Sequence, residues 1–227
     1  MTSVPRHIAF IPARKGSKGL PNKNRLLFQN GLNFIRSLDW IDEIALSSDD
    51  SVLLDIAIDS GVSCIQRPSA LSGDNISIKE TAVHFVSDLK IESGAIIWLF
   101  YLPIVGRQKV DFISAYRLIC SSPADSWCSF IPATTHPFNC WRYDSDTHSL
   151  QQYVKNSCFR RQDLPDAWML HHYICAFKAG ALVDLNDELV GSRTHPFFMS
   201  IDQAMNFLEI DGPDDFDRWR LGEFPNG

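Results

Sequence analysis

The sequence predicts an α/β fold with a mainly parallel sheet and helices on both of its faces. Apolar runs of strand length alternate with segments of helical spacing from residue 8 to about residue 131. Parallel strands need such crossover helices, and strands buried on both faces form continuous apolar runs. The chain has 227 residues, 45% apolar and 11% aromatic, so it is long enough for a core and unlike a disordered chain.

The expected elements follow one another in the order that this fold requires. Apolar runs predict strands at residues 8–12, 44–48, 62–65, 95–101, 126–131 and 172–177. Apolar positions at helical spacing predict helices at residues 52–57, 75–90 and 110–120. Asp49-Asp50-Ser51 can cap the first of these helices, and Pro213 with the acids that follow it opens a last helix.

Residues 132–170 interrupt this alternation, so we expect one domain over residues 1–227 with a β-rich lobe inserted at about 132–170. The aromatic side chains of this lobe have few aliphatic partners in sequence, and a patch of that kind usually meets another surface. They are Phe138, Trp141, Tyr143, Tyr153, Phe159 and Trp168.

Composition excludes several classes of protein. The longest uncharged apolar stretch, residues 94–106, contains Pro103 and is too short for a membrane helix, so no membrane partner is expected. The N-terminal residues lack the pattern of a signal peptide, which favours a cytoplasmic protein with six reduced cysteines. No Cys-x-x-Cys pair suggests a structural zinc site, and a net charge of −6 argues against general nucleic-acid binding.

The charge is unevenly distributed along the chain. Residues 1–38 contain seven Lys or Arg and no Asp or Glu, whereas the remaining residues hold 14 basic and 27 acidic side chains. This asymmetry predicts a small anionic ligand at one basic pole. The alternative is a chance clustering of cations on a solvated face.

The loop after the first predicted strand is the strongest motif of the chain. Residues 11–24 read IPARKGSKGLPNKN, and the two glycines allow tight turns and a close approach of backbone to a ligand. Exposed amides together with Arg14, Ser17 and Lys18 can surround a phosphate chain. The Gly-Lys-Ser/Thr ending of a Walker loop is absent, and no Gly-x-Gly-x-x-Gly supports a dinucleotide site.

This loop resembles the signature of the acylneuraminate cytidylyltransferases, the CMP-sialic acid synthetases. Further similar motifs follow in the family's order across most of the chain. They are Ser47-Ser48-Asp49-Asp50, Arg67-Pro68-Ser69-Ala70-Leu71 with Asp74, Arg161-Gln162-Asp163-Leu164-Pro165, and Glu209-Ile210-Asp211. The resemblance implies a Rossmann-like nucleotidyltransferase fold and a transfer of CMP from CTP to the anomeric hydroxyl of a sialic-type (nonulosonic) acid sugar, with release of pyrophosphate.

The resemblance also implies roles for individual residues. Arg14, Lys18 and Asp211 would be catalytic, and Asp211 with Glu209 would hold Mg²⁺, a hard cation that suits carboxylate and phosphate ligands. The lobe would form a homodimer in which Arg161 reaches the sugar carboxylate of the neighbouring subunit. The nucleotide would be bound by Arg14, Gly16, Ser17, Lys18, Asn24 and Arg67.

The sequence departs from the family mainly on the sugar side. The family's Leu-Gln-Pro-Thr-Ser-Pro-Leu-Arg is replaced by residues 100–107, FYLPIVGR, in which only Arg107 remains in register. One lobe arginine is replaced by Met169. Tyr101, His171 and Arg161 are therefore expected to bind a remodelled sugar, with His172 beside them. The segment from residue 27 to residue 44 is also short, which predicts a stunted first helix.

Each assignment has an alternative. Arg67 could pair with Asp74, Asp211 could only cap the last helix, and Lys23 and Arg25 are expected to be solvated cations. The pair His171-His172 could serve as a metal or acid–base site. For the whole chain, the alternatives are a catalytically impaired nucleotide-binding homologue and a cytidylyltransferase for another acid sugar such as Kdo, although the loop fits the sialic-type pattern better.

Overall fold

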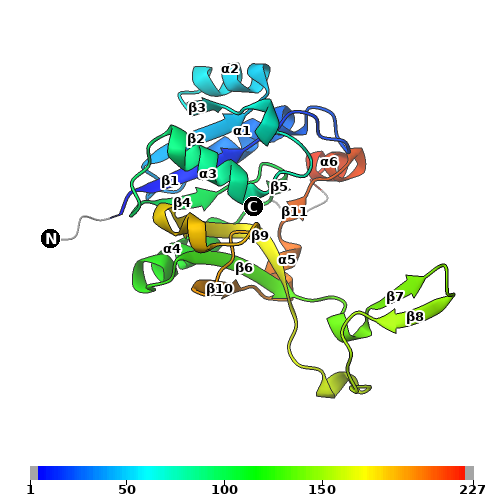
Figure 1. The fold of residues 1–227 in the computed structure, drawn as a ribbon. Coiled ribbons are helices and arrows are strands. Elements are labelled where there is room, and N and C mark those ends of the chain that lie inside the picture. The colour runs from blue at the N-terminus through cyan, green and yellow to red at the C-terminus, as the bar shows by residue number, and fades with distance from the viewer. Residues whose placement is uncertain (1–4, 223–227) are drawn as a thin grey trace.

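The computed structural model describes residues 5–222, and its centre is a seven-stranded sheet in the order β10-β6-β9-β4-β1-β2-β3 (Figure 1). The strands are β1 (His7–Pro12), β2 (Glu43–Ser48), β3 (Ser63–Gln66), β4 (Ile96–Leu99), β6 (Ser126–Pro132), β9 (Trp168–Lys178) and β10 (Thr194–Phe198). Neighbouring strands pair in parallel except at β9, which runs antiparallel to β4 and to β6. The predicted fold class is confirmed.

Helices cover both faces of the sheet. They are α1 (Lys23–Arg36), α2 (Ser51–Asp59), α3 (Ile78–Asp88), α4 (Lys109–Ser121), α5 (Ile201–Met205) and α6 (Pro213–Arg220). Asp50 caps α2 as expected, and Ser77 and Glu80 form a capping box that begins α3. α1 spans 14 residues, so the prediction of a stunted first helix is wrong.

The alternation of side chains along β1 divides the core between the two faces of the sheet. Ala9 and Ile11 pack with the buried residues of α1, α2 and α4. Ile8 and Phe10 pack on the other face, where the ring of Phe10 lies 4.2 Å from that of Phe85 on α3. The sheet is thus a rigid platform, and its loops at the carboxyl ends of β1, β2 and β4 are fixed from both sides.

The C-terminal segment returns to the first loop of the chain. β11 (Leu208–Glu209) pairs antiparallel with β5 (Ile104–Val105), and Ile210 donates its N–H to the carbonyl of Pro103 at 2.9 Å. The sequence did not predict β5, β10, α5 or β11, because each is too short to show a period. Their effect is to bring residues 208–212 beside residues 19–24.

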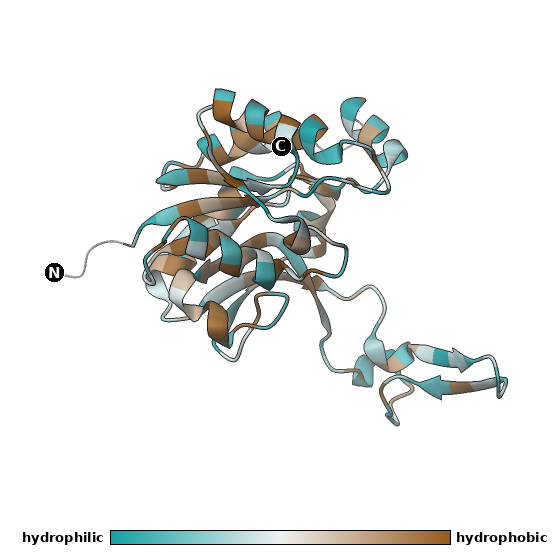
Figure 2. Cartoon of the chain, turned by 45° about the horizontal axis from the view of Figure 1, so that its top comes forward, coloured by the Kyte–Doolittle hydropathy of each residue, from teal (hydrophilic) through white to brown (hydrophobic). Residues whose placement is uncertain are grey.

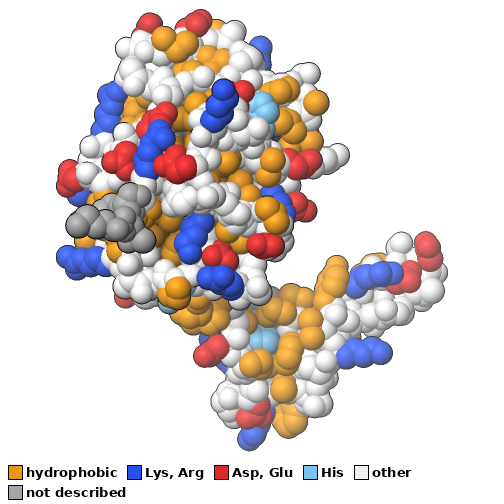
Figure 3. Space-filling model, turned by 60° about the vertical axis from the view of Figure 1, so that its left-hand side comes forward, with side chains coloured by type: hydrophobic (Ala, Val, Ile, Leu, Met, Phe, Trp, Pro, Cys, Tyr) orange, Lys and Arg blue, Asp and Glu red, His pale blue; other side chains and the backbone are white. Residues whose placement is uncertain are grey.

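Residues 133–167 form an arm that projects from the end of β6 and returns into β9 (Figure 2). It contains the hairpin β7 (Trp141–Asp144) and β8 (Ser149–Gln152) and three-residue 3₁₀ turns. Hydrophobic side chains gather along it (Figure 3), and Phe159 is 91% exposed. A hairpin of two strands has no core of its own, so these side chains lack cover within the chain.

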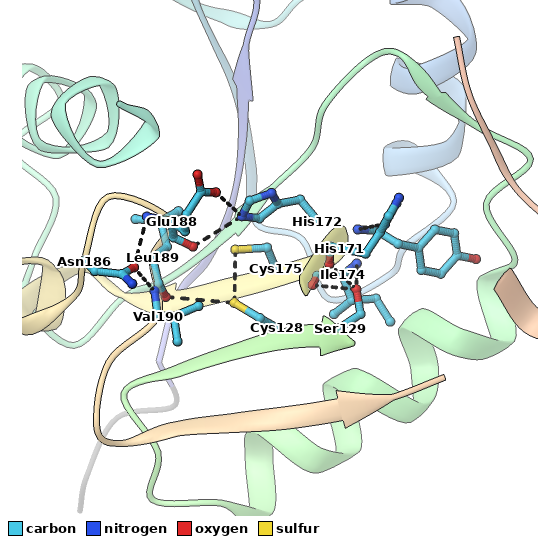
Figure 4. A network of polar contacts seen from close by, with 11 residues as sticks. Cys128, Ser129, His171, His172, Ile174, Cys175, Asn186, Glu188, Leu189 and Val190 are labelled. Carbon is cyan, nitrogen blue, oxygen red and sulfur yellow. Dashed lines mark hydrogen bonds and ion pairs between the residues drawn. The ribbon is translucent and has the colours of Figure 1, made fainter. Parts of the chain in front are cut away.

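Within residues 5–222, no helix is long and apolar enough to cross a membrane. All six cysteines are free thiols. Cys128 on β6 and Cys175 on β9 are directly opposite each other in the sheet, and their Sγ atoms lie 3.7 Å apart within the buried core (Figure 4).

Candidate active site

A cavity of about 260 Å³ lies at the carboxyl ends of β1 and β4, where ligands bind in open α/β sheets. Residues from β1, the loop that follows it, α1, α3 and the segment after β4 form its walls. The lining residues are Pro12, Arg14, Ser17, Lys23, Asn24, Arg67, Ile76, Ile78, Thr81, Tyr101 and Pro103. Arg14, Ser17, Asn24, Arg67 and Tyr101, which the sequence analysis placed in the site, therefore meet in one cavity.

The loop from Ala13 to Asn22 is tied down at its beginning. Ala13 donates its N–H to the carbonyl of Ser47 at 3.0 Å. The hydroxyl of Ser48 donates to the carbonyl of Ala13 at 2.5 Å. Asn24 donates its amide to the carbonyl of Arg14 at 2.9 Å. In this structure Asn24 therefore holds the loop, which sequence reasoning did not foresee.

Two glycines let this loop take its path. Gly16 has a φ of +83°, a conformation that side chains of L residues rarely adopt. Gly19 has no space for a side chain, because a Cβ there would overlap the carbonyl oxygen of Asp211. The loop thus packs backbone against backbone on the C-terminal segment.

One carboxylate bridges the two cations of the loop. Asp74 accepts from Arg14 at 2.5 Å and lies 2.6 Å from the ammonium of Lys18. Hydrogen bonds from Lys18 and Arg14 hold the pKa of the Asp74 carboxyl below its usual range. Asp74 thus supplies the anionic oxygens that these cations bind, at positions where phosphate oxygens would compete with it.

Arg67 does not pair with Asp74, so that alternative is wrong. Its side chain is buried and donates to the hydroxyl of Ser47 at 3.2 Å and to the Ser47 carbonyl at 2.7 Å. Burial lowers the pKa of Arg67 to about 10, although the charge of Asp49 opposes that shift. A buried guanidinium beside a cavity and without a bonded carboxylate is suited to bind an anion.

Lys23 and Arg25 are not solvated cations, contrary to expectation. The ammonium of Lys23 donates to the carbonyl of Ile210 at 2.8 Å and lies 3.5 Å from the carboxylate of Asp211. Arg25 forms two bonds, of 2.7 and 2.6 Å, with the buried carboxylate of Asp50. Both partners are far away in sequence, which is why spacing arguments missed them.

The structure also corrects the prediction that the N-terminal cations form one basic pole. Arg6 lies before β1, at the opposite end of the strand from the loop, and pairs with Glu43. Arg36 lies at the last turn of α1 and bonds the carbonyl of Ser60. The acids of later segments therefore compensate most of the N-terminal cations, and the charge asymmetry of the sequence is not one positive face.

Asp211 does not cap α6 with its side chain. The N-cap position is Gly212, and the carboxylate of Asp215 accepts from the N–H groups of Asp211 and Gly212. The Asp211 side chain is 80% exposed. Burial, and secondly the charge of Asp211, raise the pKa of Glu209, so these two carboxylates repel each other.

Tyr101 joins the cavity to a second group of polar residues. Its ring lies edge-on to the ring of His172 at 5.6 Å. The Nε2 atom of His172 lies 3.3 Å from the carbonyl of Glu188 and 3.6 Å from its carboxylate (Figure 4). Burial raises the pKa of Tyr101, so its phenol stays neutral and can donate a hydrogen bond. The sequence analysis did not identify Glu188.

His171 has different neighbours from His172, so the two rings do not form a paired metal site. Its Nδ1 accepts from the N–H of Tyr173 at 3.0 Å, and its ring contacts that of Phe207. Burial lowers the pKa of His171 to about 4. It is therefore neutral near pH 7 and forms no ion pair with Glu209, whose carboxylate lies 3.9 Å from its Nε2.

The arm places Arg161 apart from this cavity within one chain. Arg161 lines a separate hollow of about 560 Å³ formed by arm residues. Arg160 is held by two bonds to Asp163, of 2.6 and 2.9 Å. No such pair is found for Arg161 in the described part of the chain.

No protein-family model matches the sequence. Among curated proteins, the N-acylneuraminate cytidylyltransferases of Streptococcus agalactiae serotype V (strain ATCC BAA-611 / 2603 V/R) and serotype III (strain NEM316) are each 25% identical to it over 224 residues. The matches cover 92% of this chain and 51% of each relative, so the chain spans about half their length. The resemblance stated from the motifs is confirmed.

Solved structures of low sequence identity show the fold. A CMP:2-keto-3-deoxy-manno-octonic acid synthetase complexed with CTP superposes with a TM-score of 0.68 and 14% identity, over 95% of this chain and 97% of that chain. A 4-diphosphocytidyl-2C-methyl-D-erythritol synthase gives a TM-score of 0.66 and 15% identity, over 97% and 99%. The chain has the Rossmann-like fold of these cytidylyltransferases.

Proposed function

We propose that the protein is a cytidylyltransferase that transfers CMP from CTP to the anomeric hydroxyl of a sialic-type acid sugar and releases pyrophosphate. The observation that carries this proposal is the loop of residues 13–22, whose Arg14 and Ser17 line one cavity with the buried Arg67. The similarity to N-acylneuraminate cytidylyltransferases and to a synthetase complexed with CTP supports the choice of nucleotide.

The residues around the cavity would act mainly by neutralising charge and by positioning. Arg14 and Lys18 would exchange Asp74 for oxygens of the triphosphate, and Arg67 would bind the nucleotide from the floor of the cavity. The sugar hydroxyl would then attack the α-phosphate in line with the departing pyrophosphate, which needs no covalent nucleophile. Asn24 would preserve the loop geometry through its bond to the Arg14 carbonyl.

We propose that a magnesium ion is bound by Asp211 and Glu209, next to Lys23 of the cavity wall. Within residues 5–222, no three His, Cys, Asp or Glu side chains form a ready metal cluster. Mg²⁺, however, is commonly bound by one or two carboxylates and completed by substrate phosphates. Asp211 and Glu209 repel each other and so suit a cation, which would neutralise charge on the triphosphate. Lys23 would hold Asp211 in place.

The sugar side favours a second candidate, an acid sugar other than sialic acid, with Kdo as one example. Where the family has an amide and two hydroxyls, this chain has Tyr101, Pro103 and Ile104. Tyr101 lines the cavity and lies beside His172, which in turn lies beside Glu188. These side chains offer a phenol, an imidazole and a carboxylate, which bind a different pattern of sugar hydroxyls. We propose that they, with His171, select the acid sugar.

The arm supports a homodimer as the working form. Its exposed aromatic side chains lack cover within the chain, and Arg161 lies too far along the arm to line its own cavity. An arginine fork is suited to a carboxylate. We propose that Arg161 binds the sugar carboxylate in the partner's site.

The decisive experiment is a pyrophosphate-release assay with CTP, Mg²⁺ and a panel of nonulosonic acids and Kdo. Release with one acid sugar identifies the enzyme and its substrate. Calorimetric CTP binding without release for any sugar would favour the impaired nucleotide-binding homologue. If CTP does not bind at all, the proposal for this cavity fails.

A further inference from the structure

A second and larger cavity, of about 890 Å³, shares no lining residue with the candidate active site. We call it the α1–α6 groove. Its walls come from the last turns of α1, the start of α4 and the end of α6. The lining residues are Asn30, Asn33, Phe34, Ser37, Val105, Gly106, Arg107, Gln108, Lys109, Val110, Asn206, Leu208, Trp219 and Arg220.

The charged lining of the groove is entirely basic. Arg107, Lys109 and Arg220 contribute to its wall, whereas no described lining residue is Asp or Glu. This is unusual for a chain with a net charge of −6. Lys109 reaches an exposed acid outside the lining, Asp39, at 3.3 Å, a contact that solvent weakens.

Arg107 is a buried cation that forms no ion pair with a carboxylate of the described residues. It is 7% exposed, and its guanidinium carbon lies over the rings of Phe34 and Phe100, 5.9 and 5.7 Å from their centroids. It donates to the carbonyls of Tyr101 and Ile104. Within the described chain its Nε has no hydrogen-bond partner, and no acid lies within ion-pair distance of it.

The acid on the neighbouring helix does not compensate Arg107. Asp111 accepts from the hydroxyl of Tyr173 at 2.9 Å and from the amide of Gln203 at 2.8 Å. Asp111 lies in the first turn of α4, and the N–H of Gln108 donates to the hydroxyl of Tyr173 at 2.8 Å, so this helix start is already compensated. A buried cation without an anionic partner, such as Arg107, is unfavourable because it has lost its hydration. An anion bound in the groove would offset that loss of free energy.

The remaining wall offers apolar and aromatic surface. Phe34, Val105, Leu208 and Trp219 line it beside the amides and the hydroxyl. Small-molecule sites are typically concave and largely apolar, with a few convergent polar groups that fix orientation. We propose that the α1–α6 groove binds a small organic anion that carries a phosphate or carboxylate on an aromatic or apolar body.

This site would be separate from the nucleotide cavity, although the two share structural elements. Lys23 and Asn24 of α1 line the nucleotide cavity, and Asn30 and Asn33 of the same helix line the groove. A probe of the groove must therefore be kept away from the cations of the first cavity. The Arg14→Ala, Lys18→Ala double variant removes two of these cations and serves as the background for the test, and Lys23 and Arg67 stay the same in every protein that is compared.

The test uses phenyl phosphate as the anionic probe and benzyl alcohol as its neutral counterpart, with binding followed by saturation-transfer NMR. Lys109→Gln and Arg220→Gln, added together to the background, should weaken phenyl phosphate binding by about tenfold, since two exposed cations that attract the phosphate are lost. Arg117→Gln is the matched control, because Arg117 is exposed on the same helix but outside the groove. It should change the affinity by less than about twofold.

Three outcomes would overturn the proposal. The first is that phenyl phosphate shows no saturable binding to the background protein, and the second is that Arg117→Gln weakens binding as much as the groove substitutions do. The third is that benzyl alcohol binds as tightly as phenyl phosphate, which would exclude an anion site. Both cations are exposed, so matching thermal midpoints should confirm that each variant is folded. None of these outcomes depends on whether CTP is the nucleotide.

Discussion

At the scale of single residues, the cations of the candidate active site differ in the acid with which each of them pairs. Asp74 holds Arg14 and Lys18, Asp50 holds Arg25, and Asp211 lies beside Lys23. Among the described residues, Arg67 alone of these five cations pairs with no carboxylate, and it donates to the hydroxyl and the carbonyl of Ser47 instead. The exposed pairs cost little to exchange, whereas the buried pair of Asp50 is part of the fold.

The first prediction concerns the exposed pairs. Lys18→Ala should weaken CTP binding by about 1.5–3 kcal/mol, the scale of a charged hydrogen bond. Asp74→Ala should instead strengthen CTP binding several-fold, because the cations no longer have an internal competitor. Calorimetry measures both. Unchanged affinity in Lys18→Ala would remove this residue from the site, and weaker binding in Asp74→Ala would show that Asp74 assists the nucleotide.

The second prediction concerns the buried pair. Asp50→Asn keeps a side chain that can cap α2 but loses the charge, and should destabilise the protein by about 1.5–3 kcal/mol. Asp50→Ala should cost about 1 kcal/mol more, because the cap is lost as well. Urea unfolding at pH 7 measures both. Equal stability of the two variants would show that the cap contributes nothing.

The pH dependence of Asp50 has a definite sign. The bonds from Arg25 hold the pKa of Asp50 below its usual value, so the unfolded chain takes up a proton first as the pH falls. The stabilisation by Asp50 is therefore complete above about pH 4, the unfolded pKa. It is lost as the pH falls through the lower, folded pKa. The stability difference between wild type and Asp50→Asn should shrink over that acidic range.

At the scale of elements, sequence reasoning succeeded where the signal is local. The Asp50 cap, the apolar strands and the Pro213 start of α6 depend on neighbours within a few residues, and all three are present. It failed where the partner is distant. No local pattern could show that Lys23 reaches the carbonyl of Ile210, or that two-residue strands such as β5 and β11 pair.

Arg107 shows that predictions of function from local sequence patterns have the same limit. The sequence singled it out only as the one residue of its motif to remain in register. In the structure it holds the carbonyls of Tyr101 and Ile104 and lines the α1–α6 groove. Burial, which lowers its pKa to about 10, is a property of the packed fold and cannot be read from spacing.

The third prediction separates the two glycines of the loop from Ala13 to Asn22. Gly16→Ala meets no atom but must adopt a positive φ, so it should cost about 1–2 kcal/mol of stability. Gly19→Ala would push the loop away from Asp211 and should reduce CTP affinity by at least about tenfold, or 1.4 kcal/mol. Unfolding and calorimetry distinguish them. Normal CTP binding by Gly19→Ala would show that this contact is not needed.

At the scale of the whole molecule, the arm sets the expected assembly. The fourth prediction is that inactive Lys18→Ala and inactive Arg161→Ala subunits regain activity when they are mixed and allowed to exchange. If sites are shared, one of the two sites in a mixed dimer carries both defects and the other carries neither. A monomer at micromolar concentration in sedimentation, or no recovery despite proven exchange, would contradict the shared site.

The contact of Gly19 with Asp211 also determines when this part of the candidate site can form during synthesis. The loop, β1, β2 and β4 leave the ribosome early, yet the wall that presses on Gly19 and engages Lys23 is made almost at the end of the described chain. A nascent chain can therefore complete most of its sheet before the backbone that packs against Gly19 and Lys23 has been made. A chain truncated before residue 208 would keep all seven strands of the central sheet and lack these contacts, so it would separate the contribution of the sheet from that of the C-terminal segment.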